Sequence, residues 1–184
     1  MRMRFFRTAS LAAVMVGVAM ATVGAQKTTE ISKGTGGSPH VKSEWTVDGA
    51  HISVTYGRPS LKGRTMGKTV DPYPGKEWRT GADDATTLTT DKPLKFGTLA
   101  LPAGTYTLYT VAGDTEWTLV VSKKTGQWGI PYPVGQDFGR APMKVGKTAA
   151  PVEQLTIAVD DTPAGGTLRV EWGTTSAAIP FTVG

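Results

Sequence analysis

The sequence contains no cysteine. This absence excludes disulfide bonds, thiol catalysis and thiolate metal sites, and it excludes the lipid-modified cysteine of a bacterial lipoprotein. A folded domain of this composition must therefore be stabilised by its hydrophobic core.

Histidine is nearly as scarce. The two histidines, His40 and His51, have no second histidine at the spacing of a zinc site. We expect both to be surface residues near strand ends. No G-x-S-x-G turn marks a serine nucleophile, and no glycine-rich turn leads into a helix that would hold a phosphate. The sequence therefore predicts no metal, no cofactor and no nucleotide site.

Long apolar runs are absent except near the N-terminus. Three arginines in residues 1–7 precede an apolar run at 11–23 that ends in Val-Gly-Ala. This order is typical of a signal peptide cleaved after Ala25, because about 13 apolar residues are too few to cross a bilayer, which needs roughly 20. We predict that residues 1–25 are a signal peptide and that the protein is exported, periplasmic or extracellular, with no membrane span after cleavage.

The charge is modest once this segment is set aside. The whole chain has a net charge of +5, and three of those charges are the arginines of the predicted signal peptide. Residues 26–184 therefore carry +2, with both signs scattered, which is not the basic surface of a nucleic-acid-binding protein.

Most of the remaining chain alternates in polarity with a period of two. Val41, Trp45 and Val47 fall on one face of a predicted strand, and Asp48-Gly49 is a preferred hairpin turn into the next strand. Further strands are predicted at 85–90, 94–101, 105–111, 116–122, 152–159, 167–172 and 177–183. Because no window keeps a period of 3.6, we predict an all-β fold, either an antiparallel β-sandwich or a small open barrel.

The domain boundaries follow from the same pattern. Residues 26–37 are polar and rich in Thr, Ser, Lys and Gly, which predicts a flexible tether. Residues 38–184 form a single predicted domain. Two segments inside it, 57–84 and 125–150, are broken by glycine and proline yet contain aromatic residues, so we predict two long ordered loops over one end of the strands.

Several short motifs resemble one known family. They are YGRPSLKGR at 56–64, WRTGA at 78–82, ATT at 85–87, PAGTY at 102–106, EWT at 116–118 and WG at 128–129. Together they resemble a family of exported bacterial proteins catalogued as domain of unknown function 2911, over nearly all of the chain from Ser38 onward. The family has no assigned activity, so the resemblance implies no catalytic residue. This chain has Asp83 where members often have Asn, and Tyr109 where some have His.

The two loops supply the candidate site residues. The predicted ligand-binding residues are Arg58, Arg64, Trp78, Arg79, Asp83 and Trp128. Arginine offers a planar fork to carboxylates, phosphates and sugar hydroxyls, and tryptophan offers a flat face to a sugar. The alternative, which we favour slightly, is that these arginines tie the loop to the sheet through acids or backbone carbonyls.

Three functions remain open. The leading hypothesis is a non-enzymatic module that binds a small polar or anionic ligand or a glycan. The second is a carboxylate-dependent hydrolase using Asp83 or Glu77, although Asp83 and Asp84 should point to opposite faces of an extended chain. The third is a structural or partner-binding protein of the cell envelope. The sequence predicts no particular oligomeric state.

Overall fold

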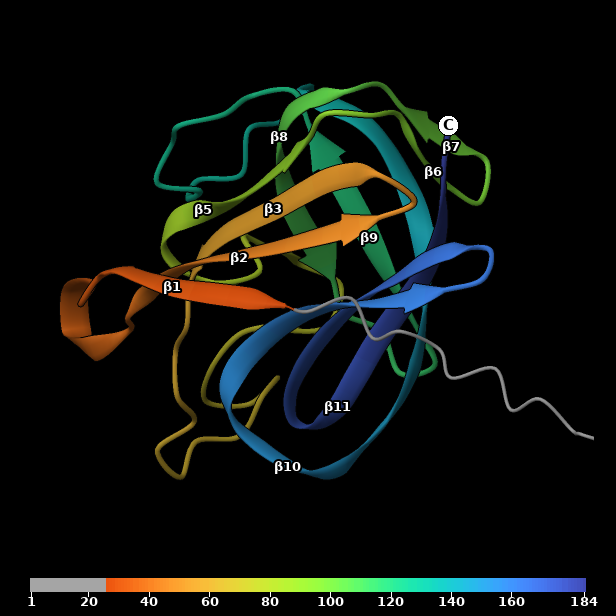
Figure 1. Cartoon of the computed structure of the whole chain (residues 1–184). Coiled ribbons are helices and arrows are strands. Elements are labelled where there is room, and N and C mark those ends of the chain that lie inside the picture. The colour runs from red at the N-terminus through yellow and green to blue at the C-terminus, as the bar shows by residue number, and fades with distance from the viewer. Residues whose placement is uncertain (1–25) are drawn as a thin grey trace, which may run out of the picture.

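The computed structural model describes residues 26–184 (Figure 1). The predicted signal peptide, residues 1–25, lies outside this range. The elements are β1 (Lys27–Ser32), the 3-10 helix η1 (Thr35–Gly37), β2 (His40–Val47), β3 (Ala50–Gly57), β4 (Glu77–Trp78), β5 (Ala82–Thr90), β6 (Leu94–Phe96), β7 (Leu99–Leu101), β8 (Gly104–Val111), β9 (Glu116–Ser122), β10 (Asp137–Thr162) and β11 (Gly165–Val183). No helix in this range is both long enough and apolar enough to cross a membrane.

The described strands form one open 11-stranded sheet. Its order is β1-β2-β3-β5-β8-β9-β10-β11-β6-β7, and β4 pairs with β8. Every strand pair is antiparallel. The all-β prediction is therefore confirmed, and the sheet is open, with β1 and β7 at its two edges.

The sheet curls strongly, so that strands distant in the sheet order enclose one core. The long strands β10 and β11 bend across the molecule (Figure 1) and contact β2. Trp45, Leu155 and Trp172 belong to the same buried cluster, although they come from β2, β10 and β11. Burial of such large apolar side chains is the main source of stability in a chain without disulfides.

The β2–β3 hairpin forms as the sequence predicts. Asp48 and Gly49 have φ values of 47° and 72°, the two positive values that a type I′ turn requires. The strands then pair in register from Val47↔Ala50 to His40↔Gly57. This register decides which side chains of β2 and β3 face the core and which face outward.

The prediction of a loop at 125–150 is wrong from residue 137 onward. Residues 137–150 belong to β10, which pairs with β9 from Asp137 to Lys144. Ala141 and Met143 are buried and alternate with exposed neighbours. Glycine and Pro142 interrupt the alternation of apolar and polar residues here, so the sequence pattern indicates a loop although the chain is extended.

Two other elements also differ from the sequence prediction. A strand was predicted at 94–101, but Gly97 has φ 60° and divides it into the β6–β7 hairpin. The tether predicted at 26–37 contains β1, which pairs with β2. All six residues of β1 are exposed, so no alternating pattern marks the strand in the sequence.

The first predicted loop, 57–84, is ordered and lies against the sheet. The Leu61 N–H donates to Glu153 O at 2.9 Å, and Ser60 forms a bridge with Gln154 of β10. The same segment contributes β4, whose Trp78 is buried. This path brings the chain back to β5 immediately before the polar residues described next.

Candidate functional site

The outer face of β2, β3 and β5 is lined with polar side chains. Trp45, Ile52 and Leu88 point into the core, so their neighbours along each strand point outward. The outward residues that line cavities are His40, Lys42, Glu44, Thr46, His51, Ser53, Thr55, Thr87 and Thr89. Two cavities lie on this face, and we name each after a residue that lines it.

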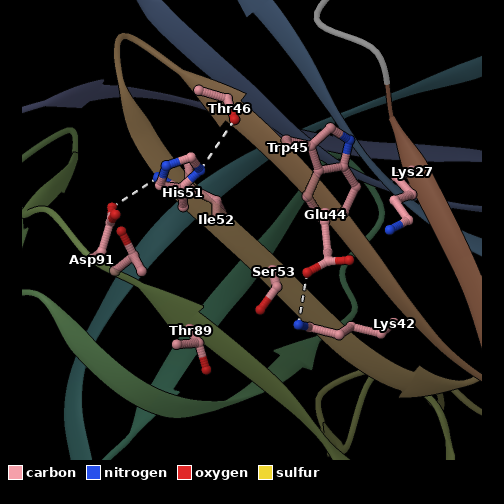
Figure 2. Close-up of a pocket in the computed structure, with 11 residues that line it drawn as sticks. Lys27, Lys42, Glu44, Trp45, Thr46, His51, Ile52, Ser53, Thr89 and Asp91 are labelled. Atoms are coloured by element: carbon pink, nitrogen blue, oxygen red, sulfur yellow. Dashed lines mark hydrogen bonds and ion pairs between the residues drawn. The ribbon is translucent and has the colours of Figure 1, made fainter.

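The Lys42 pocket is the larger cavity, with a volume of ≈ 460 Å³ (Figure 2). Lys42 Nζ lies 2.7 Å from Glu44 Oε1. The hydrogen bond from Lys42 lowers the pKa of the Glu44 carboxyl, which therefore stays ionised. Lys27 reaches this pocket from β1, so the edge strand forms part of its wall.

His51 also lines the Lys42 pocket, near the β2–β3 turn. The Thr46 hydroxyl lies 3.2 Å from His51 Nδ1, and the His51 backbone N–H donates to Asp91 Oδ1 at 2.7 Å. His51 is exposed. It is therefore a surface residue beside the β2–β3 turn, as the sequence predicts.

The His40 pocket has a volume of ≈ 260 Å³. It is lined by Ile31, His40, Thr55, Tyr56, Gly57, Asp84, Ala85, Thr87, Gly126 and Gln127. His40 Nε2 lies 3.0 Å from Asp83 Oδ2, and His40 Nδ1 lies 4.0 Å from Asp84 Oδ2. The Thr35 N–H also donates to Asp83 Oδ2, at 2.9 Å. Two neighbouring carboxylates therefore flank one imidazole ring.

This arrangement corrects one sequence prediction. His40 was expected at the surface, but it is only 9% exposed and is paired with Asp83, which is 8% exposed. Asp83 adopts φ 62°, in the left-handed region. Its side chain is buried whereas that of Asp84 is exposed, so only Asp84 lines the pocket, and the two acids do not face one ligand together.

The backbone around this pair is unusual at two further positions. Thr80 also has a positive φ, 55°, which is rare for a β-branched residue. At Gly57 an added Cβ would lie 2.2 Å from Ala82 O and 3.1 Å from His40 Nε2. Positive φ in non-glycine residues costs of order 1–3 kcal/mol each and is concentrated at functional sites.

Gln127 lines the His40 pocket from the loop between β9 and β10. Its side-chain N–H groups donate to Thr107 Oγ1 and Tyr109 Oη, both at 3.3 Å, and to Lys124 O at 3.1 Å. Its Oε1 is buried and has no hydrogen-bond partner among residues 26–184. Because this oxygen is enclosed by the protein, the Gln127 amide holds the loop against β8 and does not reach a ligand.

Arg79, Asp83 and Trp128 meet beside the same pocket. Arg79 Nη1 donates to the backbone oxygens of Asp83 and Trp128. Its guanidinium carbon lies 5.2 Å from the centre of the Trp128 ring, which is a cation–π contact. Burial lowers the pKa of Arg79, and Asp83 opposes that shift. Trp128 remains 48% exposed, so part of its surface is accessible to a ligand.

The other three predicted residues serve the scaffold. Arg58 donates to Leu155 O at 2.8 Å and to the Thr156 hydroxyl. Arg64 donates to the backbone oxygens at 60 and 61. Trp78 is 4% exposed and stacks on Trp172 with ring centres 5.8 Å apart. Arg58 thus ties the first loop to β10, as the alternative interpretation expects, whereas Arg64 bonds only to carbonyls of its own loop, and Trp78 belongs to the core.

His40 and Gln127 line the pocket although neither belongs to the predicted site residues. His40 pairs with a carboxylate 43 positions away, and no local motif signals that contact. Within residues 26–184 the structure has no cluster of three histidine, cysteine or acidic side chains arranged to hold a metal ion.

Comparison with known families gives one match. Residues 38–181 match a family described as "Protein of unknown function (DUF2911)". Searches of curated proteins and of solved structures gave no match. The matched region begins after β1 and contains all residues of the His40 pocket except Ile31.

Proposed function

This chain belongs to the DUF2911 family, and we propose that it is an exported, non-enzymatic module that binds a glycan in the His40 pocket. The observation that carries the proposal is that His40, Asp84, Thr55 and Thr87 line one cavity next to the loop that carries the exposed Trp128. The apolar run at 11–23, preceded by arginines, supports export.

The groups lining the pocket suit sugar hydroxyls, which both donate and accept hydrogen bonds. The Asp84 carboxylate is an acceptor, the Thr55 hydroxyl can both donate and accept, and the Thr87 hydroxyl, which donates to Ala85 O, can accept. The His40 ring adds a further polar group, which Asp83 holds in one orientation. A pocket with several acceptors fits a ligand with several hydroxyl groups.

An anionic ligand is less well suited to this pocket. The three arginines that the sequence offered for an anion, Arg58, Arg64 and Arg79, donate to oxygens of the protein itself. Asp84 lines the pocket with a side chain that is 71% exposed, and its negative charge would repel an anion. We therefore favour an uncharged glycan over an acidic metabolite.

Trp128 provides the apolar part of such a site. Sugar rings present C–H groups that pack against aromatic faces, and Trp128 is next in sequence to Gln127 of the pocket. Arg79 holds its ring by the cation–π contact, which reduces the entropy that a ligand would otherwise have to remove.

Titration calorimetry with soluble neutral glycans tests the proposal. We expect Asp84→Ala to weaken binding about tenfold, because it removes a carboxylate that accepts hydrogen bonds from the ligand. Lys144→Ala, at an exposed position of β10, is the matched control and should bind as the original protein does. Absence of heat with every glycan in the panel would contradict the proposal.

A hydrolase is the second candidate, because Asp83 and Asp84 both lie near His40. A glycosidase needs two carboxyl groups that face the scissile bond. Asp83 is buried and accepts hydrogen bonds from Thr35 and from His40, so Asp84 is the only one of the two that lines the pocket. Release of reducing sugar from the same glycans, abolished in Asp84→Asn, would favour hydrolysis over binding.

A further inference from the structure

The two pockets are consecutive along the same strands. β1, β2, β3 and β5 each contribute a residue to both: Ile31 and Lys27, His40 and Lys42, Thr55 and Ser53, and Thr87 and Thr89. Within β2, β3 and β5 the two residues are two positions apart. Side chains two positions apart lie on the same face of a strand, so the pockets adjoin along the strand direction.

The register places hydroxyl groups in two parallel rows between the pockets. Ser53 pairs with Thr89, and Thr55 pairs with Thr87, across β3 and β5. Neighbouring strands are about 4.8 Å apart, and side chains two positions apart are separated by roughly 7 Å along the strand. These four hydroxyls therefore form a polar grid at the junction of the two cavities.

The combined groove is long enough for a chain of several sugars. On β3 it extends from His51 in the Lys42 pocket to Gly57 in the His40 pocket. Six residues of extended strand span about 20 Å. A single sugar would occupy only one of the two cavities, whereas a linear chain would use both.

The charges along the groove are mixed, with one more acid than lysine. Its lysines, Lys27 and Lys42, are accompanied by the acids Glu44, Asp84 and Asp91. Lys42 is itself paired with Glu44. A polyanion would thus meet more repulsion than attraction, whereas an uncharged chain with many hydroxyls can hydrogen-bond along the whole groove.

We infer that the ligand is a linear, uncharged oligosaccharide that lies along β3 and β5 and occupies the His40 and Lys42 pockets together. This inference rests on the proposed function, because it names the class of glycan that the His40 pocket binds. It adds that the Lys42 pocket is a second subsite of the same site.

Calorimetry with a homologous series of neutral oligosaccharides, from monosaccharide to hexasaccharide, tests this inference on the original protein. The affinity should rise at least about tenfold with chain length and then level off, once both cavities are filled. Equal affinity for the monosaccharide and the hexasaccharide would overturn the inference and leave the proposed function intact. No binding of any member would instead contradict the proposed function.

A variant distinguishes the second subsite from a general effect of chain length. Thr89→Val removes a hydroxyl of the Lys42 pocket and keeps a β-branched residue in the strand. It should weaken hexasaccharide binding severalfold and leave monosaccharide binding unchanged. Thr182→Val, at an exposed threonine of β11, is the control and should change neither affinity. An unchanged hexasaccharide affinity in Thr89→Val, or tighter binding of an acidic oligosaccharide of equal length, would overturn the inference.

Discussion

Asp83 combines an unfavourable backbone conformation with two favourable contacts. Its carboxylate accepts hydrogen bonds from the Thr35 N–H and from His40, and these contacts hold the left-handed turn that brings Asp84 to the same ring. The cost of the turn is thus offset by buried polar pairing.

Replacement of Asp83 therefore tests the pair. Asp83→Ala should lower the free energy of unfolding by about 1–3 kcal/mol, because it leaves the buried His40 ring without its acceptor and removes the acceptor of the Thr35 N–H. Asp84→Ala is the matched comparison: its side chain is exposed and 4.0 Å from His40, so its loss should change stability by less than about 0.5 kcal/mol. Urea unfolding measures both, and equal effects would contradict this assignment.

The two tryptophans of the predicted site should behave in opposite ways. Trp78→Ala should reduce the free energy of unfolding by about 3–5 kcal/mol, because Trp78 is buried against Trp172. Trp128→Ala should leave the unfolding midpoint nearly unchanged and weaken glycan binding, because Trp128 is half exposed. A destabilised Trp128→Ala with unaltered binding would contradict the division of roles.

Tyr132 is expected to titrate at unusually high pH. Burial, the hydrogen bond to Asp137 and the charge of Asp137 raise its pKa to about 12. The folded-state pKa lies above the unfolded value of 10, so the stability it contributes is present below pH 10 and is lost as the pH rises from 10 to about 12. Phenolate absorbance should show a component that titrates near 12 and is missing in Tyr132→Phe. Titration of that group near 10 would contradict the assignment.

Among the strands, β1 contributes to both pockets although all of its residues are exposed. It buries none of its residues, yet Lys27 and Ile31 line the two pockets. It also lies outside the matched family region, which begins at residue 38. The edge strand β1 therefore contributes side chains to a groove whose other lining residues lie within the matched family region.

Removal of β1 tests this role. A protein that starts at Lys33 should retain its β-sheet circular dichroism and nearly the same melting temperature, because no core side chain is lost. It should bind the hexasaccharide severalfold more weakly, because both cavities lose a wall. Unaltered affinity would show that β1 takes no part in the groove.

The elements also show which patterns can be read from a sequence. β2 and β3 could be predicted because each buries one face and leaves most of the other face at least partly exposed, which gives the period of two. β1 could not, because both of its faces are exposed. The first part of β10 was missed because glycine and Pro142 interrupt the pattern, whereas pairing with β9 keeps the strand extended.

At the scale of the whole molecule, the site depends on contacts between distant segments. Of the six predicted residues, Arg79, Asp83 and Trp128 come together because the β9–β10 loop folds over β5, where the Ala85 N–H donates to Gln127 O at 3.1 Å. The pairing of β2 with β3 brings His40 to the site. No local sequence pattern links His40 to Asp83. Residue types alone could suggest candidate site residues, but they could not predict which of these residues lie together in the folded protein.

The strands β6 and β7 take no part in the groove. They stand at the opposite end of the sheet order from β1, β2, β3 and β5 (Figure 1), and none of their residues lines either pocket. A ligand bound in the groove should therefore leave their side chains without a contact, which provides an internal control within one molecule.

Amide chemical shifts recorded with and without a neutral hexasaccharide show directly whether the ligand lies along β3 and β5. In that case the shifted signals should lie along one line of the sheet, from His51 and Thr89 through Thr55 and Thr87 to Gln127, and the signals of β6 and β7 should not change. Shifts confined to β6, β7 and β11, or no shifts at saturating oligosaccharide, would contradict this position of the ligand.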